Sequence, residues 1–212
     1  MKTTSALPAT FLFFLLFAFT AAAAAFAGNG LVLDSDGDPL RNGGKYFISP
    51  VNGGGIFAGA VRHGSDTNCS LAVIRSSNRW STTISSPFKI LYISEKLPLN
   101  ISFAQFAPNV CTKSKNWLVT RSYPIREPVM VGSAQEFDGS VMDGYFSVWS
   151  VDETKGHYKL VFCHTGGECG NIGVLVDINN FQRLVVTVDE PLVFKFDKVK
   201  DSSDASKLSM VV

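Results

Sequence analysis

Short stretches in which apolar and polar residues alternate recur along the chain, and glycine-rich turns separate them. The stretches are rich in Val, Ile, Phe, Tyr and Trp, the residues that favour β-strands. The pattern predicts strands at Lys45–Ile48, Leu71–Arg75, Phe88–Ile93, Ile101–Phe106, Trp117–Ser122, Tyr145–Val151, Tyr158–Cys163, Ile172–Asp177, Arg183–Val188 and Leu192–Asp197. No convincing amphipathic helix of ten or more residues is found. Many short strands of this kind predict an all-β protein, either a sandwich or a barrel.

Two pairs of segments resemble each other across the chain. Gly44–Ile48 resembles Gly144–Val148, and Leu97–Phe103 resembles Glu190–Phe196. Echoes of strand pairs favour a barrel with pseudo-threefold symmetry over a linear array of repeats.

The first 27 residues have the composition of a secretory signal peptide. Lys2 provides a basic start, Phe11–Phe19 is apolar, and Ala25-Phe26-Ala27 places small residues where a signal peptidase cuts. The alternative is a membrane anchor, but no basic stop sequence follows the apolar stretch. We therefore predict cleavage after Ala27 and a secreted protein, either extracellular or vacuolar.

The rest of the chain has the size of one domain, which we place at residues 28–198. Nothing after residue 27 is long and apolar enough to span a bilayer, so no membrane partner is expected. Residues 199–212 are rich in Ser, Asp and Lys, and we expect this tail to be loose or trimmed.

The charge of the chain is balanced, with 19 Lys and Arg against 18 Asp and Glu. Because no basic stripe is present, we expect no nucleic-acid partner. No nucleophile elbow and no metalloprotease motif accompany the three histidines, so an enzyme is the least favoured class and no cofactor is predicted. Asp34, Asp36 and Asp38 alternate as in a calcium loop, but the later Gly and Glu of such a loop are missing, which favours turn carboxylates.

Four cysteines remain after the leader, and in a secreted chain an even number indicates disulfides. Three pairings are possible. The sequential pairing, Cys69–Cys111 with Cys163–Cys169, closes one long and one short loop, and we take it as the prediction. A metal site made of Cys163, His164 and Cys169 is the alternative, but the spacing matches no standard zinc pattern. No metal is therefore expected.

Two Asn-X-Ser acceptors for N-glycosylation are present, at Asn68 and at Asn100. Asn68 adjoins a predicted disulfide cysteine, which hinders modification. Asn100 follows a polar break between predicted strands and is the better candidate.

The N-terminal run Val32 to Ile48 resembles the signature of the plant Kunitz (soybean trypsin inhibitor type) protease inhibitors. That signature places apolar residues, an Asp, a Gly turn and a Tyr at fixed spacing, and it is matched by Val32, Asp34, Gly37, Leu40, Tyr46 and Ile48. Further segments around all four cysteines extend the resemblance over nearly all of residues 30–198. The loop from Cys163 to Cys169 is shorter than in many members. The resemblance implies a β-trefoil of about twelve strands in three similar units, a fold that the internal echoes also favour.

The segment Ser86-Pro87-Phe88-Lys89-Ile90-Leu91-Tyr92 resembles the exposed protease-binding loop of that family. The resemblance implies that Lys89 enters the specificity pocket of a trypsin-like serine protease and that Lys89–Ile90 is the reactive bond. Lysine suits this role because trypsin-like pockets hold an Asp at their base. Pro87 restricts the backbone and biases Ser86 toward an extended conformation. In the absence of the resemblance, Lys89 would be interpreted as a solvated surface lysine.

No disulfide closes this loop tightly, and the resemblance assigns its support to Asn42. An amide has two donors and one acceptor, which is enough to bridge backbone groups of a loop. The alternative is an ordinary Asn-Gly-Gly turn.

Together these features predict a monomeric inhibitor of trypsin-like serine proteases that blocks the enzyme reversibly, in the manner of a substrate. Two other functions stay open. One is a storage or stress protein on the same fold, and the other is a carbohydrate-binding trefoil. The second would need repeated aromatic and polar pockets, and three copies are not evident; Trp80, Trp117 and Trp149 are better explained as core or barrel-lid residues.

Overall fold

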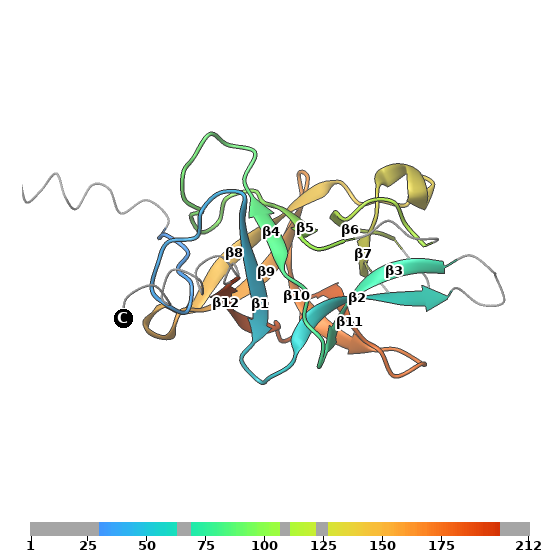
Figure 1. The fold of residues 1–212 in the computed structure, drawn as a ribbon. Coiled ribbons are helices and arrows are strands. Elements are labelled where there is room, and N and C mark those ends of the chain that lie inside the picture. Colours follow the sequence, from blue (N-terminus) through green and yellow to red (C-terminus); the bar gives the residue numbers. More distant parts are fainter. Residues whose placement is uncertain (1–29, 63–68, 107–110, 122–126, 200–212) are drawn as a thin grey trace, which may run out of the picture. The chain divides into compact units, whose positions relative to one another are not determined.

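The computed structural model describes residues 30–62, 69–106, 111–121 and 127–199. The predicted leader, the acceptor Asn68 and the tail beyond residue 199 lie outside these residues. The described part of the chain forms twelve β-strands and two short 3₁₀ helices, with no α-helix (Figure 1). The all-β prediction is confirmed.

The strands, in chain order, are β1 (Gly44–Pro50), β2 (Gly55–Arg62), β3 (Cys69–Ser76), β4 (Thr82–Ser85), β5 (Asn100–Phe103), β6 (Trp117–Val119), β7 (Val129–Val131), β8 (Gly144–Asp152), β9 (His157–His164), β10 (Cys169–Val176), β11 (Gln182–Thr187) and β12 (Val193–Lys198). The 3₁₀ helices are η1 (Ala134–Phe137) and η2 (Glu153–Lys155).

Half of the strands pair edge to edge into a closed barrel. β1 pairs with β4, β4 with β5, β8 with β9, β9 with β12, and β12 with β1, all antiparallel. The ring closes between β5 and β8, where a bridge joins Leu99 to Phe146. The remaining strands form the hairpins β2–β3, β6–β7 and β10–β11, which meet because β3 also pairs with β7 and β11. The same four-strand unit thus occurs three times, which confirms the β-trefoil.

The repeat in the structure differs from the echoes that the sequence suggested. Gly44–Ile48 begins β1, the first strand of its unit, whereas Gly144–Val148 lies in β8, the last strand of its unit. The second echo likewise matches β5 to β12. The equivalent strands β1 and β9 instead share a Gly-x-Tyr-x-(Ile/Leu) pattern, at Gly44–Ile48 and Gly156–Leu160. The echoes therefore do not mark the structural repeat, although the symmetry that they favoured is correct.

The core contains a row of aromatic rings that meet edge to face or at a tilt. The contacts run in the order Phe57, Trp80, Phe103, Trp117, Phe146 and Phe162, with neighbouring ring centroids 4.7–6.3 Å apart. Such pairs stabilise a core beyond the area that they bury. Trp117 is a core residue, and Trp80 is partly buried against the core, in line with the prediction of core or barrel-lid positions. Trp149 is half-buried, and the ammonium groups of Lys96 and Lys159 lie over its ring.

Three strands were not predicted, and one prediction was wrong. β2 contains Gly and Ala, which are poor strand formers, but they fit a crowded hairpin, because a Cβ on Gly59 would lie 2.5 Å from Cδ1 of Ile74 and would require that side chain to move. β4 and β7 are only four and three residues long. The predicted strand Phe88–Ile93 is instead part of the loop between β4 and β5. Phe88, Leu91 and Tyr92 are exposed and only Ile93 is fully buried, so burial in a sheet does not explain the β-like composition.

Candidate functional site

The loop between β4 and β5 (green in Figure 1) is anchored at its C-terminal side on the barrel. Ile93 is fully buried, and the buried Glu95 carboxylate accepts a hydrogen bond from the Ser150 N–H of β8 at 2.8 Å. The Lys96 N–H donates to the Val148 carbonyl at 3.0 Å, and the Leu99 N–H donates to the Phe146 carbonyl at 2.8 Å. The loop therefore returns to the barrel along a fixed path.

The segment that precedes β1 runs antiparallel to this loop. Main-chain hydrogen bonds join Val32 N–H to Ile93 C=O, Ile93 N–H to Leu40 C=O, and Asn42 N–H to Leu91 C=O, at 2.8–3.0 Å. Residues 31–42 thus form a strip that holds the outer part of the loop.

Asn42 lies in a tight turn at the end of this strip. The Gly44 N–H donates to the Arg41 carbonyl at 2.9 Å, and Gly43 has a φ of +79°. A positive φ at the third position is the requirement of a type II turn, which glycine meets without strain. The Gly43 N–H also donates to the Ile84 carbonyl of β4, at 2.8 Å. The turn therefore fixes the backbone of Asn42 next to the loop.

The Asn42 side chain reaches the loop and contacts its backbone alone. Its Nδ2 lies 3.4 Å from the carbonyl oxygen of Ser86, 3.2 Å from that of Phe88 and 3.1 Å from that of Ile90. Its Oδ1 accepts the Ser86 N–H at 2.8 Å. Two N–H donors serve three carbonyls, so at least one of these hydrogen bonds is shared. The structure places the Asn42 side chain against the predicted loop, whereas the side chain of an ordinary turn residue would make no such hydrogen bonds.

The three carbonyls belong to alternate residues, and this spacing has a chemical consequence. The carbonyls of Ser86, Phe88 and Ile90 all lie within hydrogen-bond distance of Asn42 Nδ2, whereas in the described structure the carbonyl of the intervening Lys89 makes no hydrogen bond with Asn42. Among the described residues, no hydrogen bond occupies the main-chain N–H or C=O of Lys89. The peptide at Lys89 is therefore available to another molecule.

Lys89 lies at the exposed tip of the loop. The Ile90 N–H donates to the Phe88 carbonyl at 2.9 Å, which encloses Lys89 in a three-residue turn. Phe88 is 50% exposed, Leu91 68% and Tyr92 36%, and Pro87 is also exposed. Ser86 is buried, and its hydroxyl accepts the Phe88 N–H at 3.3 Å. All seven predicted loop residues are together, with apolar side chains flanking one lysine.

The acidic turn before this strip is internally bonded. Asp34 Oδ1 accepts the N–H groups of Asp36 and Asp38 at 3.0 Å, and the Lys198 ammonium lies 3.4 Å from Asp34 Oδ2. A hydrogen bond from Lys198 holds the pKa of the Asp38 carboxyl below its usual value. These are turn carboxylates, as predicted, and no group of metal-binding side chains is found in the described residues.

Two of the cysteines form a cross-strand disulfide. Cys163 in β9 pairs directly with Cys169 in β10, and their Cα atoms are 3.9 Å apart. These sulfurs are therefore bonded to each other, which removes the thiolates that the alternative metal site would require. Cys111 is also disulfide-bonded. The side chain of Cys69 lies outside those described, so the Cys69–Cys111 pairing stays a prediction.

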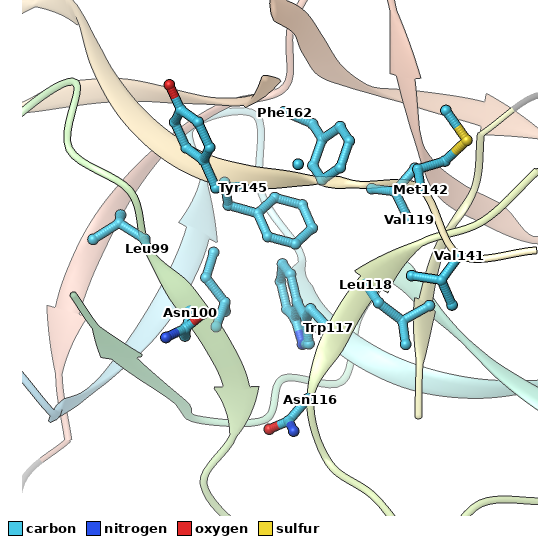
Figure 2. Close-up of a pocket in the computed structure, with 13 residues that line it drawn as sticks. Leu99, Asn100, Asn116, Trp117, Leu118, Val119, Val141, Met142, Tyr145 and Phe162 are labelled. Carbon is cyan, nitrogen blue, oxygen red and sulfur yellow. The ribbon is translucent and has the colours of Figure 1, made fainter. Parts of the chain in front are cut away.

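A hollow of about 500 Å³ lies between β5, β6 and β8, away from Lys89. Figure 2 shows the residues that line this hollow, with Asn100, Asn116 and Trp117 toward the centre and Leu118, Val141 and Met142 to their right. Trp117 is only 6% exposed, and its Nε1 is sealed from solvent, with no hydrogen-bond partner among the described residues. A buried ring offers no face for a sugar, so the hollow does not support the carbohydrate-binding alternative.

One residue of this region was recognised only as part of a sequence signature. The Tyr46 hydroxyl accepts the Arg41 N–H, next to Asn42, at 2.8 Å. The signal for such a role is the Gly-x-Tyr pattern that β1 shares with β9, because a repeated buried tyrosine indicates a repeated contact.

No helix in the described ranges has the length and hydropathy needed to cross a membrane.

Comparison with known proteins agrees with this geometry. Trypsin inhibitor A of Glycine max is 36% identical over 210 residues, covering 93% of this chain and 94% of its own. The crystal structure of trypsin inhibitor 1 from Senna obtusifolia is 46% identical, with a TM-score of 0.74 over 88% of this chain and 99% of that one. Soybean trypsin inhibitor in its complex with porcine pancreatic trypsin is 36% identical, with a TM-score of 0.69 over 80% and 99%. Residues 32–198 match the legume Kunitz description, "trypsin and protease inhibitor". The chain thus belongs to the legume Kunitz family of trypsin and protease inhibitors, which are not enzymes.

Proposed function

We propose that the protein inhibits trypsin-like serine proteases by presenting Lys89–Ile90 as a substrate-like bond. The observation that carries the proposal is the Asn42 amide, which holds alternate carbonyls of the loop and leaves the Lys89 peptide unoccupied at the exposed tip. The named relatives are trypsin inhibitors, and one was crystallised with trypsin.

The mechanism follows from the positions of these groups. The long apolar stem of Lys89 carries its ammonium to the Asp at the base of a trypsin-like pocket. The free Lys89 carbonyl then lies where the oxyanion hole of the protease binds a substrate carbonyl. Because the loop is already held in one shape, docking costs little conformational entropy.

Slow release follows from the same support. If the protease cuts the Lys89–Ile90 bond, Asn42 still holds the Phe88 carbonyl on one side of the cut and the Ile90 carbonyl on the other. The new ends stay close together, so rejoining competes with departure. The interface expected for such a complex is roughly 1,600 Å² in total.

The test is titration of bovine trypsin and chymotrypsin with the secreted, oxidised protein, beside Lys89→Ala and the control Lys113→Ala. Lys113 is another exposed lysine, outside the loop. Tight trypsin inhibition by the parent and the control, but not by Lys89→Ala, supports the proposal. Equal inhibition by all three would place the reactive bond elsewhere, and a folded parent without inhibition would favour the storage function.

We also propose that the chain is secreted after cleavage behind Ala27, with Cys69 paired to Cys111 and the tail after residue 198 loose or trimmed. The relatives are plant proteins, and the Cys163–Cys169 disulfide indicates an oxidising compartment. Intact-mass measurement of protein from the culture medium tests the cleavage site and the tail. Peptide mapping without reduction tests the pairing.

Asn100 is the proposed glycosylation site. Its side chain is exposed at the first residue of β5, and Ser102 completes the acceptor sequence. Enzymatic removal of N-glycans should lower the mass of the secreted parent but not that of Asn100→Gln. A mass loss that persists in this variant would transfer the glycan to Asn68.

A further inference from the structure

The turn that carries Asn42 has a second support, which comes from the barrel rather than from the loop. The Tyr46 hydroxyl of β1 accepts the Arg41 N–H at 2.8 Å. Tyr46 is 3% exposed, and its ring meets that of Phe196 at 6.3 Å. The hydroxyl is therefore held by packing, and it contacts the residue immediately before Asn42.

The direction of the Arg41 N–H explains why this acceptor matters. Arg41 and Tyr92 face each other in an antiparallel bridge whose hydrogen bonds are made by their neighbours, Asn42 N–H to Leu91 C=O and Ile93 N–H to Leu40 C=O. At such a position the N–H of Arg41 points away from the loop. Among the described residues, the Tyr46 oxygen is its hydrogen-bond partner. Without this oxygen, a partly buried donor at the turn would lack a partner within the protein.

The space beside the ring is also adapted to this contact. A Cβ on Gly44 would lie 2.7 Å from Cε2 of Tyr46 and 3.0 Å from its hydroxyl oxygen, as well as 2.9 Å from the Arg41 carbonyl. Only a residue without a side chain lets the tyrosine reach under the turn. Gly44 and Tyr46 together therefore determine how closely the Arg41–Gly44 turn packs on β1.

We propose that Tyr46 is a positioning residue for the reactive loop: its hydroxyl fixes the Arg41–Gly44 turn and thereby aligns the Asn42 amide with the carbonyls on both sides of Lys89. The inference rests on the proposed inhibitory function. In the described part of the chain, the Tyr46 hydroxyl bonds to Arg41 and makes no hydrogen bond with the backbone of residues 86–92, so Tyr46 acts through Asn42.

The chain contains a matched control in Tyr158. This residue lies at the equivalent position of β9, is also 3% exposed, and its ring lies 5.8 Å from that of Phe196. Its hydroxyl accepts the Leu33 N–H of the same strip at 2.9 Å, nine positions from Asn42 along the chain. Removal of either hydroxyl leaves one strip N–H without its acceptor, but only Tyr46 adjoins the turn.

The experiment compares Tyr46→Phe with Tyr158→Phe in the secreted, oxidised protein. Three quantities are measured: urea unfolding, the inhibition constant for trypsin, and the equilibrium fraction of protein cut at Lys89–Ile90. Both variants are expected to lose similar stability. Only Tyr46→Phe should raise the inhibition constant, by about tenfold for one lost hydrogen bond at a partly buried donor, and raise the cut fraction.

Equal inhibition constants for the two variants, or no change in Tyr46→Phe, would overturn the positioning role while the parent still inhibits. Failure of the proposed function gives a different result, since the parent itself would then leave trypsin active. In that case the ¹⁵N–¹H resonances of the Asn42 side-chain amide decide. They should shift in Tyr46→Phe and stay in place in Tyr158→Phe, and unchanged resonances in both would overturn the inference.

Discussion

Two exposed loops of this protein are each organised by one polar side chain, and the two side chains bind different backbone groups. Asn42 comes from a distant segment and binds carbonyls of residues 86–90. Asp177 belongs to its own turn between β10 and β11, where Oδ1 accepts the N–H groups of Asn179 and Phe181 at 2.9 Å. A carboxylate only accepts hydrogen bonds, so it gathers N–H groups and curls the chain. An amide also donates, so it can bind carbonyls as well, as Asn42 does at residues 86, 88 and 90.

The difference determines what each tip can do. Ile178 is 97% exposed at the tip of the curled loop, and Asn180 there has a φ of +64°. The apolar, accessible tip at Ile178 lies in a turn that its own neighbour Asp177 closes, whereas both sides of Lys89 are held by Asn42 from a distant segment. Under the proposed function, exposure alone thus does not make a protease-binding loop, and the support on both sides of the tip decides.

The largest expected effect comes from truncating the side chain at each of the two loop tips. Lys89→Ala should weaken trypsin binding by about 4 kcal/mol, because hot-spot residues of an interface contribute at that scale. Ile178→Ala should leave binding unchanged. Inhibition constants for trypsin measure both. Equal losses in the two variants would contradict the distinction between the loops.

The second effect concerns the support of the curled loop. Arg183 Nε donates to Asp177 Oδ2 at 2.6 Å, and both side chains are almost fully buried. Asp177→Asn leaves the buried guanidinium without its counter-charge, so the free energy of unfolding should fall by about 3 kcal/mol. Urea denaturation measures the loss. Trypsin inhibition by the folded variant should match the parent, and a parallel loss of inhibition would show that the loops are coupled.

The third effect comes from replacing the supporting amide of Asn42 with a carboxylate like that of Asp177. Asn42→Asp replaces the donor group with a carboxylate oxygen that faces three carbonyls. The loop should lose its shape, and trypsin binding should weaken by about 2 kcal/mol through lost hydrogen bonds. Long incubation with trypsin, followed by gel analysis, should show more chain cut at Lys89–Ile90 than in the parent. An uncut variant with parental affinity would rule out the support role of Asn42.

The smallest effect is the dependence of stability on acidic pH. Burial raises the pKa of the Asp177 carboxyl, but hydrogen bonds from the Phe181 N–H and Arg183 outweigh it, and the net pKa lies below 3.8. The unfolded state therefore binds the proton more readily, and this part of the stability is present above pH 3.8 and lost as the pH falls below it. Acid unfolding curves should fall more steeply for the parent than for Asp177→Asn in that range. Parallel curves would contradict this assignment.

Much of the fold could be predicted from the sequence because alternation marks strands that bury one face. The same signal failed at Phe88–Ile93, where apolar residues serve an exposed loop, and at β2, where Gly59 and Ala residues fit a crowded hairpin. The identity of the true repeat was also missed, since β1 and β9 share few residues besides the Gly-x-Tyr pattern. Resemblance to a family was needed to join Asn42 to Lys89.

The rest of the site could not be predicted because it depends on the directions of backbone groups. The sequence alone does not show that the Arg41 N–H points toward Tyr46, or that Asn42 binds the carbonyls of Ser86, Phe88 and Ile90. The direction of the Arg41 N–H follows from the bridge register between residues 41 and 92. The candidate roles of residues can be inferred from composition and spacing, but the directions of backbone groups become visible only in the folded structure.

The hydrogen bonds of the Asn42 side chain in the described structure are all with main-chain atoms, and main-chain N–H and C=O groups are present whichever side chain a residue carries. The side chains at positions 88, 89 and 91 project outward, so the scaffold does not constrain their identity. The hydrogen bonds of the Asn42 side chain therefore do not depend on which side chains stand at these positions. Under the proposed function, substitution of Lys89 by a large apolar residue should redirect inhibition toward chymotrypsin-like enzymes while the barrel and the Asn42 support stay unchanged.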